Sequence, residues 1–326
     1  MKKILSLMLI STLISACNAN TQSTPNAVGG PQLGSVSNSA SPYGGADKSY
    51  DTTLPILREQ IAPRFQVLKF TDEATGKTLE YNLYTPKNYS PKKSYPLVMF
   101  IADASTAGKG TAAPLKQGYG GIIWATDESQ AKNPAFVLVP AFSGVAVNDA
   151  WQHTDEVDLV IPLIKQLTKT YAIDQNRLYT TGQSMGGMIS LYLNSLYPDF
   201  FAASMFVGSK WDINSLEPLK NNKFLYVTAA GDKATETAQG VGAILAKANV
   251  PYGEVEFSAK LPQTEQDSQV AALLTKGNKA NFIRFSKGSV LPTGVDGTKG
   301  ASEHMYSFDY AYLLTPAREW LFKQRK

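Results

Sequence analysis

The chain has 326 residues, of which 43% are hydrophobic and 18% are charged, so it is long enough for one large α/β domain or two small ones. Its formal charge is +4. Without Lys2 and Lys3, which lie in a segment that we expect to be removed, 29 basic residues stand against 27 acidic ones. No basic run alternates with aromatic residues, so nucleic acid is not a predicted partner.

The first 16 residues have the pattern of a signal peptide. A positively charged start is followed by an apolar run, Ile4–Ile14, which is too short to span a bilayer. The run ends in Leu-Ile-Ser-Ala before Cys17, the only cysteine of the chain, which excludes a disulfide within it.

The residues around Cys17 resemble the lipobox of bacterial lipoproteins. The resemblance implies cleavage before Cys17 and acylation, for example with palmitate, so that the protein is anchored to a membrane of the cell envelope. Asn18 stands where inner-membrane retention usually requires Asp, which favours the outer membrane. The alternative is an ordinary secretory signal and a secreted protein.

The predicted domain boundary lies near Ser49. Residues 17–48 are rich in Asn, Ser, Thr, Gly and Pro and contain almost no large apolar side chain, which is typical of a flexible tether. Residues 49–326 then form one catalytic domain.

The domain begins with two alternating segments, 65–70 and 79–84, which predict a hairpin with one polar face. Further strands are predicted where apolar residues are continuous, as in parallel strands that are buried on both faces: 95–101, 135–140, 178–181, 201–207, 224–228 and 281–285. Helical spacing of apolar residues predicts helices at 155–171, 185–196, 236–247 and 308–323. Strands that alternate with helices favour an α/β fold with a mostly parallel, doubly wound sheet.

The stretch around Ser184 carries the clearest chemical pattern. Gly182-x-Ser184-x-Gly186 lies between a predicted strand and a predicted helix, which is the nucleophile-elbow context. Glycine on both sides of the serine allows the close backbone approach that a direct strand-to-helix turn requires. The next amide, that of Met185, lies at a helix N-terminus and is a predicted oxyanion donor.

A serine nucleophile needs a base, and the base needs an acid that orients it. In α/β-hydrolases the chain order is serine, acid, histidine. His153 precedes the serine, whereas His304 follows the last predicted strand in a loop before the closing helix and is therefore the predicted base. Asp232, just after strand 224–228, is the predicted acid; Asp212 is the second choice and Glu236 the third.

The second oxyanion donor is expected in the loop after strand 95–101, where Asp103 and Ala104 are the candidates. The carboxylate of Asp103 would oppose a developing negative charge, so it is expected to face away from the oxyanion.

Three stretches then carry a family resemblance: Thr180–Met188, Tyr197–Ser204 and Glu303–Met305. They resemble bacterial secreted α/β-hydrolase esterases, a group that includes predicted prolyl-oligopeptidase-like peptidases, feruloyl esterases and polyhydroxybutyrate depolymerases. The resemblance covers about residues 65–325. It implies an α/β-hydrolase fold and a Ser-Asp-His triad, which maps onto Ser184, Asp232 and His304.

These observations predict a serine hydrolase that cleaves small or polymeric esters through an acyl-enzyme, with no cofactor. Three aromatic residues in predicted loops, Trp151, Trp211 and Tyr119, are candidates for lining a substrate pocket. No His/Cys cluster indicates a metal site. The alternatives are a serine peptidase of the prolyl-oligopeptidase type and a non-catalytic binding lipoprotein on a hydrolase scaffold.

Overall fold

The computed structural model describes residues 41–296 and 302–326. The predicted signal peptide, Cys17 and most of the predicted tether lie outside these residues. No helix among those described is both long and apolar enough to cross a membrane.

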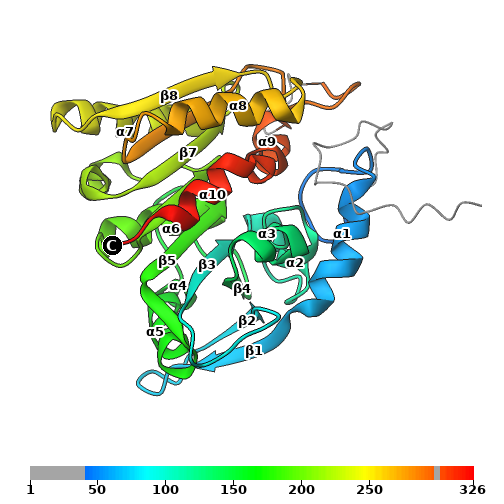
Figure 1. The fold of residues 1–326 in the computed structure, drawn as a ribbon, viewed down its shortest axis with the longest axis vertical. Coiled ribbons are helices and arrows are strands. Elements are labelled where there is room, and N and C mark those ends of the chain that lie inside the picture. The colour runs from blue at the N-terminus through cyan, green and yellow to red at the C-terminus, as the bar shows by residue number, and fades with distance from the viewer. Residues whose placement is uncertain (1–40, 297–301) are drawn as a thin grey trace, which may run out of the picture.

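One sheet of nine strands organises the described residues, in the order β1-β2-β4-β3-β5-β6-β7-β9-β8 (Figure 1). Its two antiparallel contacts, β1 with β2 and β2 with β4, lie at one end, and all the other contacts are parallel. The predicted fold class is therefore confirmed. The strands are β1 (Gln66–Thr71), β2 (Thr78–Tyr84), β3 (Tyr95–Ile101), β4 (Phe136–Ala141), β5 (Ile173–Gln183), β6 (Ala203–Val207), β7 (Phe224–Ala229), β8 (Tyr252–Phe257) and β9 (Ala280–Phe285).

Two apolar cores cover the two faces of the sheet. Alternate residues of β3 divide between them: Leu97 and Met99 belong to one core, Val98 and Phe100 to the other. The first core also takes apolar side chains from α5 (Val160–Thr170), α6 (Met185–Leu196) and α7 (Ala234–Lys247). The second takes them from α1 (Thr53–Ile61), α2 (Ala113–Lys116), α8 (Gln263–Leu274), α9 (Ser302–Leu313) and α10 (Thr315–Lys323). Burial on both faces explains the continuous apolar runs of the central strands.

Two helices that the sequence predicts as continuous are each divided in the structure. The first is divided at Leu159 into α4 (Asp155–Asp158) and α5, and the second at Leu314 into α9 and α10. Proline follows each break, at positions 162 and 316, and its ring nitrogen cannot donate to the preceding turn. At the second break the guanidinium of Arg318 donates instead to the carbonyl oxygen of Tyr312.

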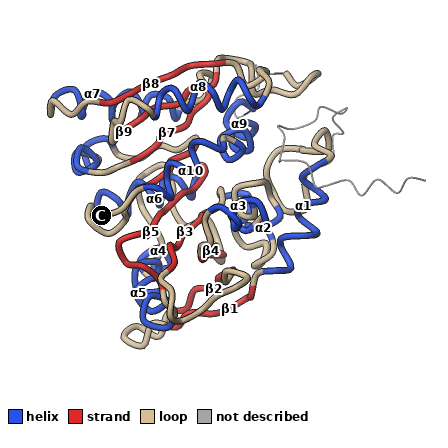
Figure 2. The backbone as a smooth tube through the Cα atoms, viewed as in Figure 1, coloured by secondary structure: helices blue, strands red, loops and turns tan. Residues whose placement is uncertain are grey.

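Other elements have no counterpart in the prediction. The helices α1, α2 and α3 (Asp127–Lys132) precede the first long amphipathic pattern, and β8 and α8 fall between residues 248 and 280, where no element is predicted. Figure 2 shows β8 at the end of the sheet opposite to β1. In the sheet of described strands β8 lies at the edge, beside β9, and it exposes Glu254 and Glu256, so it lacks the apolar run of the inner strands.

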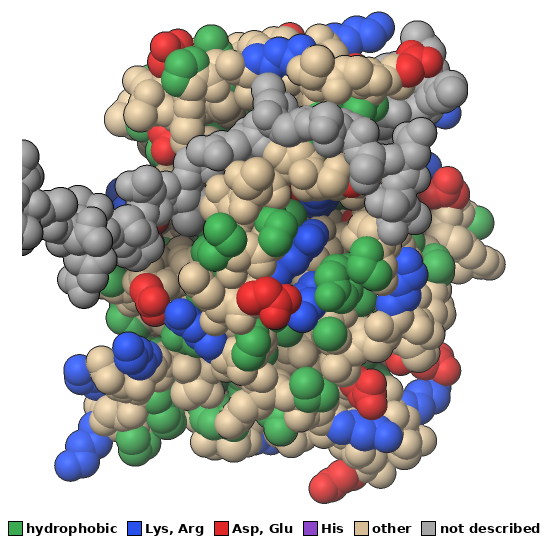
Figure 3. Space-filling view, turned by 90° about the vertical axis from the view of Figure 1, so that its right-hand side faces the viewer, with side chains coloured by type: hydrophobic (Ala, Val, Ile, Leu, Met, Phe, Trp, Pro, Cys, Tyr) green, Lys and Arg blue, Asp and Glu red, His purple; other side chains and the backbone are tan. Residues whose placement is uncertain are grey.

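Residues 41–48, assigned to the tether by their composition, lie against the domain. The amide of Gly45 donates to Ser105 Oγ at 2.7 Å. The ammonium of Lys48 lies 2.7 Å from a carboxylate oxygen of Asp309 on α9, and both side chains are buried. The packed chain therefore includes residues before Ser49. On the face shown in Figure 3, basic and acidic side chains are interspersed with apolar ones.

Candidate active site

The nucleophile elbow lies at the carboxyl end of β5, in the middle of the sheet. Ser184 has φ 49° and ψ −117°, a strained conformation for a residue with a Cβ. The two glycines of the pattern make room for it. A Cβ at Gly182 would lie 2.3 Å from the carbonyl carbon of Gly186, and one at Gly186 would lie 1.9 Å from the carbonyl oxygen of Ile101. The turn thus brings three backbone segments together, as the G-x-S-x-G spacing predicts.

Ser184, His304 and Asp232 form one chain of hydrogen bonds. The hydroxyl of Ser184 lies 2.8 Å from Nε2 of His304, and Nδ1 of that ring lies 2.7 Å from Oδ2 of Asp232. The amide of Ala234 donates to the other oxygen of Asp232 at 3.0 Å. Asp232 is 9% exposed, so the acid is shielded from water while the imidazole remains partly accessible. The arrangement can transfer a proton from the serine hydroxyl to the imidazole.

The base lies on a helix rather than in the predicted loop. His304 belongs to the first turn of α9, and its ring packs edge-on against Phe308 with the centroids 4.9 Å apart. The preceding residue, Glu303, is buried and accepts a hydrogen bond from the amide of Gly231 at 3.1 Å. Because Gly231 immediately precedes Asp232, this bond ties the start of the histidine-bearing helix to the segment with the acid.

The alternative acids and the other histidine have different partners. Asp212 accepts hydrogen bonds from the backbone and side-chain nitrogens of Asn214 and thereby begins a short 3-10 helix. Glu236 lies in the first turn of α7. His153 Nε2 lies 2.9 Å from the hydroxyl of Tyr192. Of these carboxylates, only that of Asp232 contacts His304.

The predicted oxyanion donors lie where β3 ends beside the start of α6. The close approach of Gly186 to Ile101 places the segment 102–105, here called the oxyanion segment, next to the helix N-terminus. Within the described part of the chain, the backbone amides of all three predicted donors, Asp103, Ala104 and Met185, donate to no acceptor. The carboxylate of Asp103 is occupied by donors from Ser105, Gln117 and Gln183. Free amides at this position can bind an oxygen that acquires negative charge.

The three candidate pocket residues have different environments. Trp151, which is 37% exposed, packs edge-on against the buried Trp211 with the ring centroids 5.7 Å apart. The loop before Trp151 reaches the elbow, because the amide of Ala146 lies 3.4 Å from Sδ of Met185. Tyr119, by contrast, is fully buried in the core. Tyr119 lies in a loop, as predicted, but this loop is buried. Tyr119 therefore does not line a substrate pocket in this structure.

A buried tyrosine supports the segment that follows β6. The hydroxyl of Tyr226 donates to the carbonyl oxygen of Ser209 at 2.6 Å. Burial raises the pKa of Tyr226 above its ordinary value, so the hydroxyl remains a neutral donor at physiological pH. The bond fixes the chain between the elbow and Trp211.

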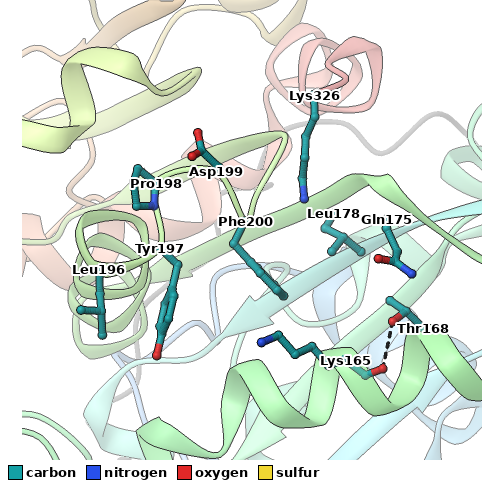
Figure 4. Close-up of a pocket in the computed structure, with 10 residues that line it drawn as sticks. All are labelled: Lys165, Thr168, Gln175, Leu178, Leu196, Tyr197, Pro198, Asp199, Phe200 and Lys326. Atoms are coloured by element: carbon teal, nitrogen blue, oxygen red, sulfur yellow. Dashed lines mark hydrogen bonds between the residues drawn. The ribbon is translucent and has the colours of Figure 1, made fainter.

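A groove of about 480 Å³ lies near the amino end of β5. It is formed where α6 ends and β5 begins, by Tyr197, Phe200, Gln175 and the terminal residue Lys326 among others (Figure 4). The nucleophile lies at the opposite, carboxyl end of β5, so this groove does not belong to the site described above.

No group of three or more His, Cys, Asp or Glu side chains within residues 41–296 and 302–326 could hold a metal ion. Three residues around the site, Gln183, Gln117 and Glu303, are not among those predicted from the sequence. Gln183 and Glu303 are chain neighbours of the nucleophile and the base, which is a usable signal. Gln117 has no such signal, because only folding brings it to the elbow.

A protein-family model described as "Putative esterase" matches residues 73–282, more than half of the chain. The chain belongs to this esterase family. No curated protein matches the sequence.

Among solved structures, a thermostable esterase superposes on this chain with a TM-score of 0.65 at 24% identity. The match covers 82% of this chain and 64% of the length of that protein. A mutant of the feruloyl esterase module from Clostridium thermocellum, in complex with sinapinate, superposes with a TM-score of 0.53 at 14% identity, covering 89% of this chain and 97% of the module. At these identities the two structures are evidence for the fold.

Proposed function

We propose that this esterase-family protein hydrolyses carboxylic esters through an acyl-enzyme on Ser184. The observation that carries the proposal is the continuous chain of hydrogen bonds from Ser184 through His304 to Asp232, at 2.8 and 2.7 Å. A hydroxyl is a poor nucleophile at neutral pH, and a base at this distance removes its proton as it attacks.

Each residue then has one role. His304 Nε2 takes the proton of Ser184 while the serine oxygen bonds to the ester carbon. The amides of Met185 and the oxyanion segment donate to the resulting oxyanion. Asp232 accepts from the Nδ1 hydrogen of the imidazolium and fixes its tautomer. The imidazolium gives its proton to the leaving alcohol, and a water molecule, activated by the same imidazole, hydrolyses the acyl-enzyme.

The test is hydrolysis of p-nitrophenyl acetate and butyrate by residues 41–326, beside the Ser184→Ala variant. Loss of the nucleophile is expected to reduce kcat by about 10⁶-fold, as in subtilisin. A fluorophosphonate probe should label the wild type at Ser184 and leave the variant unlabelled. If the folded wild type neither hydrolyses esters nor labels, the proposal is wrong and the fold serves binding instead.

A panel of substrates tests which bond the protein cleaves, ester or amide, and which acyl group it prefers. We expect turnover of aryl esters and none of peptide anilides, because amide cleavage demands more protonation of the leaving group. Methyl sinapinate belongs in the panel because a structural relative was solved with sinapinate. Turnover of peptide anilides at a comparable kcat/KM would favour the peptidase alternative.

We also propose that Cys17 carries the lipid anchor. The proposal depends on the residues around Cys17 and on the charged and apolar segments before it. Expression of the full chain in a bacterium with labelled palmitate should yield a labelled envelope protein, and Cys17→Ser should abolish the label. An unlabelled wild type that is released into the medium would indicate an ordinary secretory signal.

A further inference from the structure

A buried carboxylate lies next to the nucleophile elbow without a cation beside it. Asp103 is 2% exposed, and no Lys, Arg or His of the described residues forms an ion pair with it. Its oxygens are met by dipolar donors instead. Oδ1 accepts from the amide of Ser105 at 2.8 Å and from the Ser105 hydroxyl, and Oδ2 accepts from the side-chain amides of Gln117 and, at 3.0 Å, Gln183.

The two glutamines are also bonded to each other. Gln183 Nε2 donates to Gln117 Oε1 at 2.8 Å, and Gln117 Nε2 donates to Ser105 Oγ at the same distance. Both side chains are 1% exposed. The ring of bonds therefore connects the residue before the nucleophile, the oxyanion segment and the loop after α2, and its bonds among Asp103, Gln117 and Gln183 are buried.

This ring determines how the oxyanion segment lies relative to Ser184. The bond from the Ser105 amide to Asp103 caps the short 3-10 helix Ala104–Thr106 and so leaves the Ala104 amide free to point elsewhere. Gln183, which precedes the nucleophile, holds the other oxygen of the same carboxylate. The carboxylate is thus a rigid link between the nucleophile and a candidate oxyanion donor.

We propose that Gln183 and Gln117 are positioning residues that hold the oxyanion segment against the elbow through the carboxylate of Asp103. The inference rests on the proposed function. It also explains how a negative charge is tolerated near a developing oxyanion: four donors are directed at that charge, so its field at the reaction centre is reduced by fixed dipoles.

The experiment compares Gln183→Met with Gln266→Met in residues 41–326. Gln266 is a matched control on α8: it is 2% exposed, and its side-chain amide donates to the carbonyl oxygens of Ala259 and Leu261 at 3.0 and 2.8 Å. Both variants lose buried hydrogen bonds of similar number, so both should unfold at a lower temperature. Only Gln183→Met should lose activity, with kcat roughly 10- to 100-fold lower and KM nearly unchanged, because a misplaced oxyanion donor costs less than the 10²–10³ of a deleted one.

Two further readouts separate positioning from general destabilisation. An alkyl boronic acid, which forms a tetrahedral adduct with the serine, should bind Gln183→Met more weakly by about the factor lost in kcat/KM. The exchanged pair Asp103→Asn/Gln183→Glu keeps one donor and one acceptor facing each other and should recover part of the activity lost in Gln183→Glu alone.

The proposal is overturned if folded Gln183→Met has the kcat of Gln266→Met. Should Gln183→Met fail to fold, Gln117→Met provides the same comparison, with the same loss of kcat expected and the same refuting result. If the wild type itself turns over no ester, the proposed function fails; if the wild type is active and the Gln183 and Gln117 variants match the control, only the present inference fails.

Discussion

The buried ion pair between Lys48 and Asp309 leads to a quantitative prediction about stability. The side chains are 4% and 3% exposed and their charged atoms are 2.7 Å apart. The other oxygen of Asp309 accepts from the backbone amide of Tyr119 at 3.0 Å. The Lys48→Met variant retains an apolar side chain at position 48. It leaves the buried carboxylate of Asp309 with the Tyr119 amide as its hydrogen-bond donor. The charge of Asp309 then lacks both water and an ion-pair partner, and the charge of Arg58 acts on it without a direct contact.

Removal of one member of a buried pair costs about 3–5 kcal/mol of unfolding free energy. With a urea m-value of about 3 kcal/mol per molar, this cost lowers the midpoint of unfolding by at least about 1 M. The control is Lys77→Met, which removes an exposed ion pair with Asp155 whose charged atoms are 2.5 Å apart; the side chains are 47% and 69% exposed, and the loss should cost less than about 1 kcal/mol.

The assay is urea unfolding followed by tryptophan fluorescence at pH 7. A third variant, Lys48→Met/Asp309→Asn, removes the charge but keeps an acceptor for the Tyr119 amide, so it should recover most of the loss. The reasoning is refuted if Lys48→Met and Lys77→Met shift the midpoint equally, or if the double variant is no more stable than Lys48→Met.

Three further predictions concern the site and its surroundings. Gly186→Ala should abolish fluorophosphonate labelling, because the added Cβ would lie 1.9 Å from a carbonyl oxygen of β3. Asp232→Asn should lower kcat by about 10⁴-fold through the wrong imidazole tautomer, whereas Asp212→Asn should retain wild-type kcat; equal loss in both would reject the assigned acid. A hydrogen bond from Arg64 lowers the pKa of Asp127 in the folded protein. The contribution of this pair to the free energy of unfolding is therefore present above the unfolded pKa of about 3.9 and is lost as pH falls through the lower, folded pKa. Because the pair is exposed, Asp127→Asn should cost less than about 1 kcal/mol at neutral pH and nothing in strong acid, as urea unfolding at both pH values would show.

The parts of this protein that were predicted from the sequence are those in which the signal is local. The elbow requires glycine two residues on each side of Ser184, so its geometry appears within five consecutive residues. The central strands are buried on both faces and must be continuously apolar. The order of serine, acid and histidine along the chain then reduces the search for the base to His304 and for the acid to a few positions.

The parts that were missed depend on partners that are distant along the chain. Strand β8 has the composition of an edge, and among the strands that the structure describes it pairs with β9 alone. Residues 41–48 contain no apolar run, yet Lys48 contacts a carboxylate 261 positions later. Nothing in the composition of such a segment separates a tether from a stretch that packs on the domain, because its contacts are a buried ion pair and a hydrogen bond from Gly45 to Ser105 and not an apolar pattern.

The same distinction applies within the active site and explains why its residues differ in how readily they can be identified. Serine, histidine and aspartate react or hold protons, so their types are restricted by chemistry and can be recognised in a sequence. The backbone amides that bind an oxyanion carry no restriction on the side chain, and the sequence alone leaves Asp103 and Ala104 as equal candidates. In the structure Asp103 has a second role, because its carboxylate connects to Gln183 and Gln117. The position of the oxyanion donors therefore depends on the side chains of Gln183 and Gln117, which are buried behind the site. Their role is recognised from the distances between their atoms and the carboxylate of Asp103, not from their residue types.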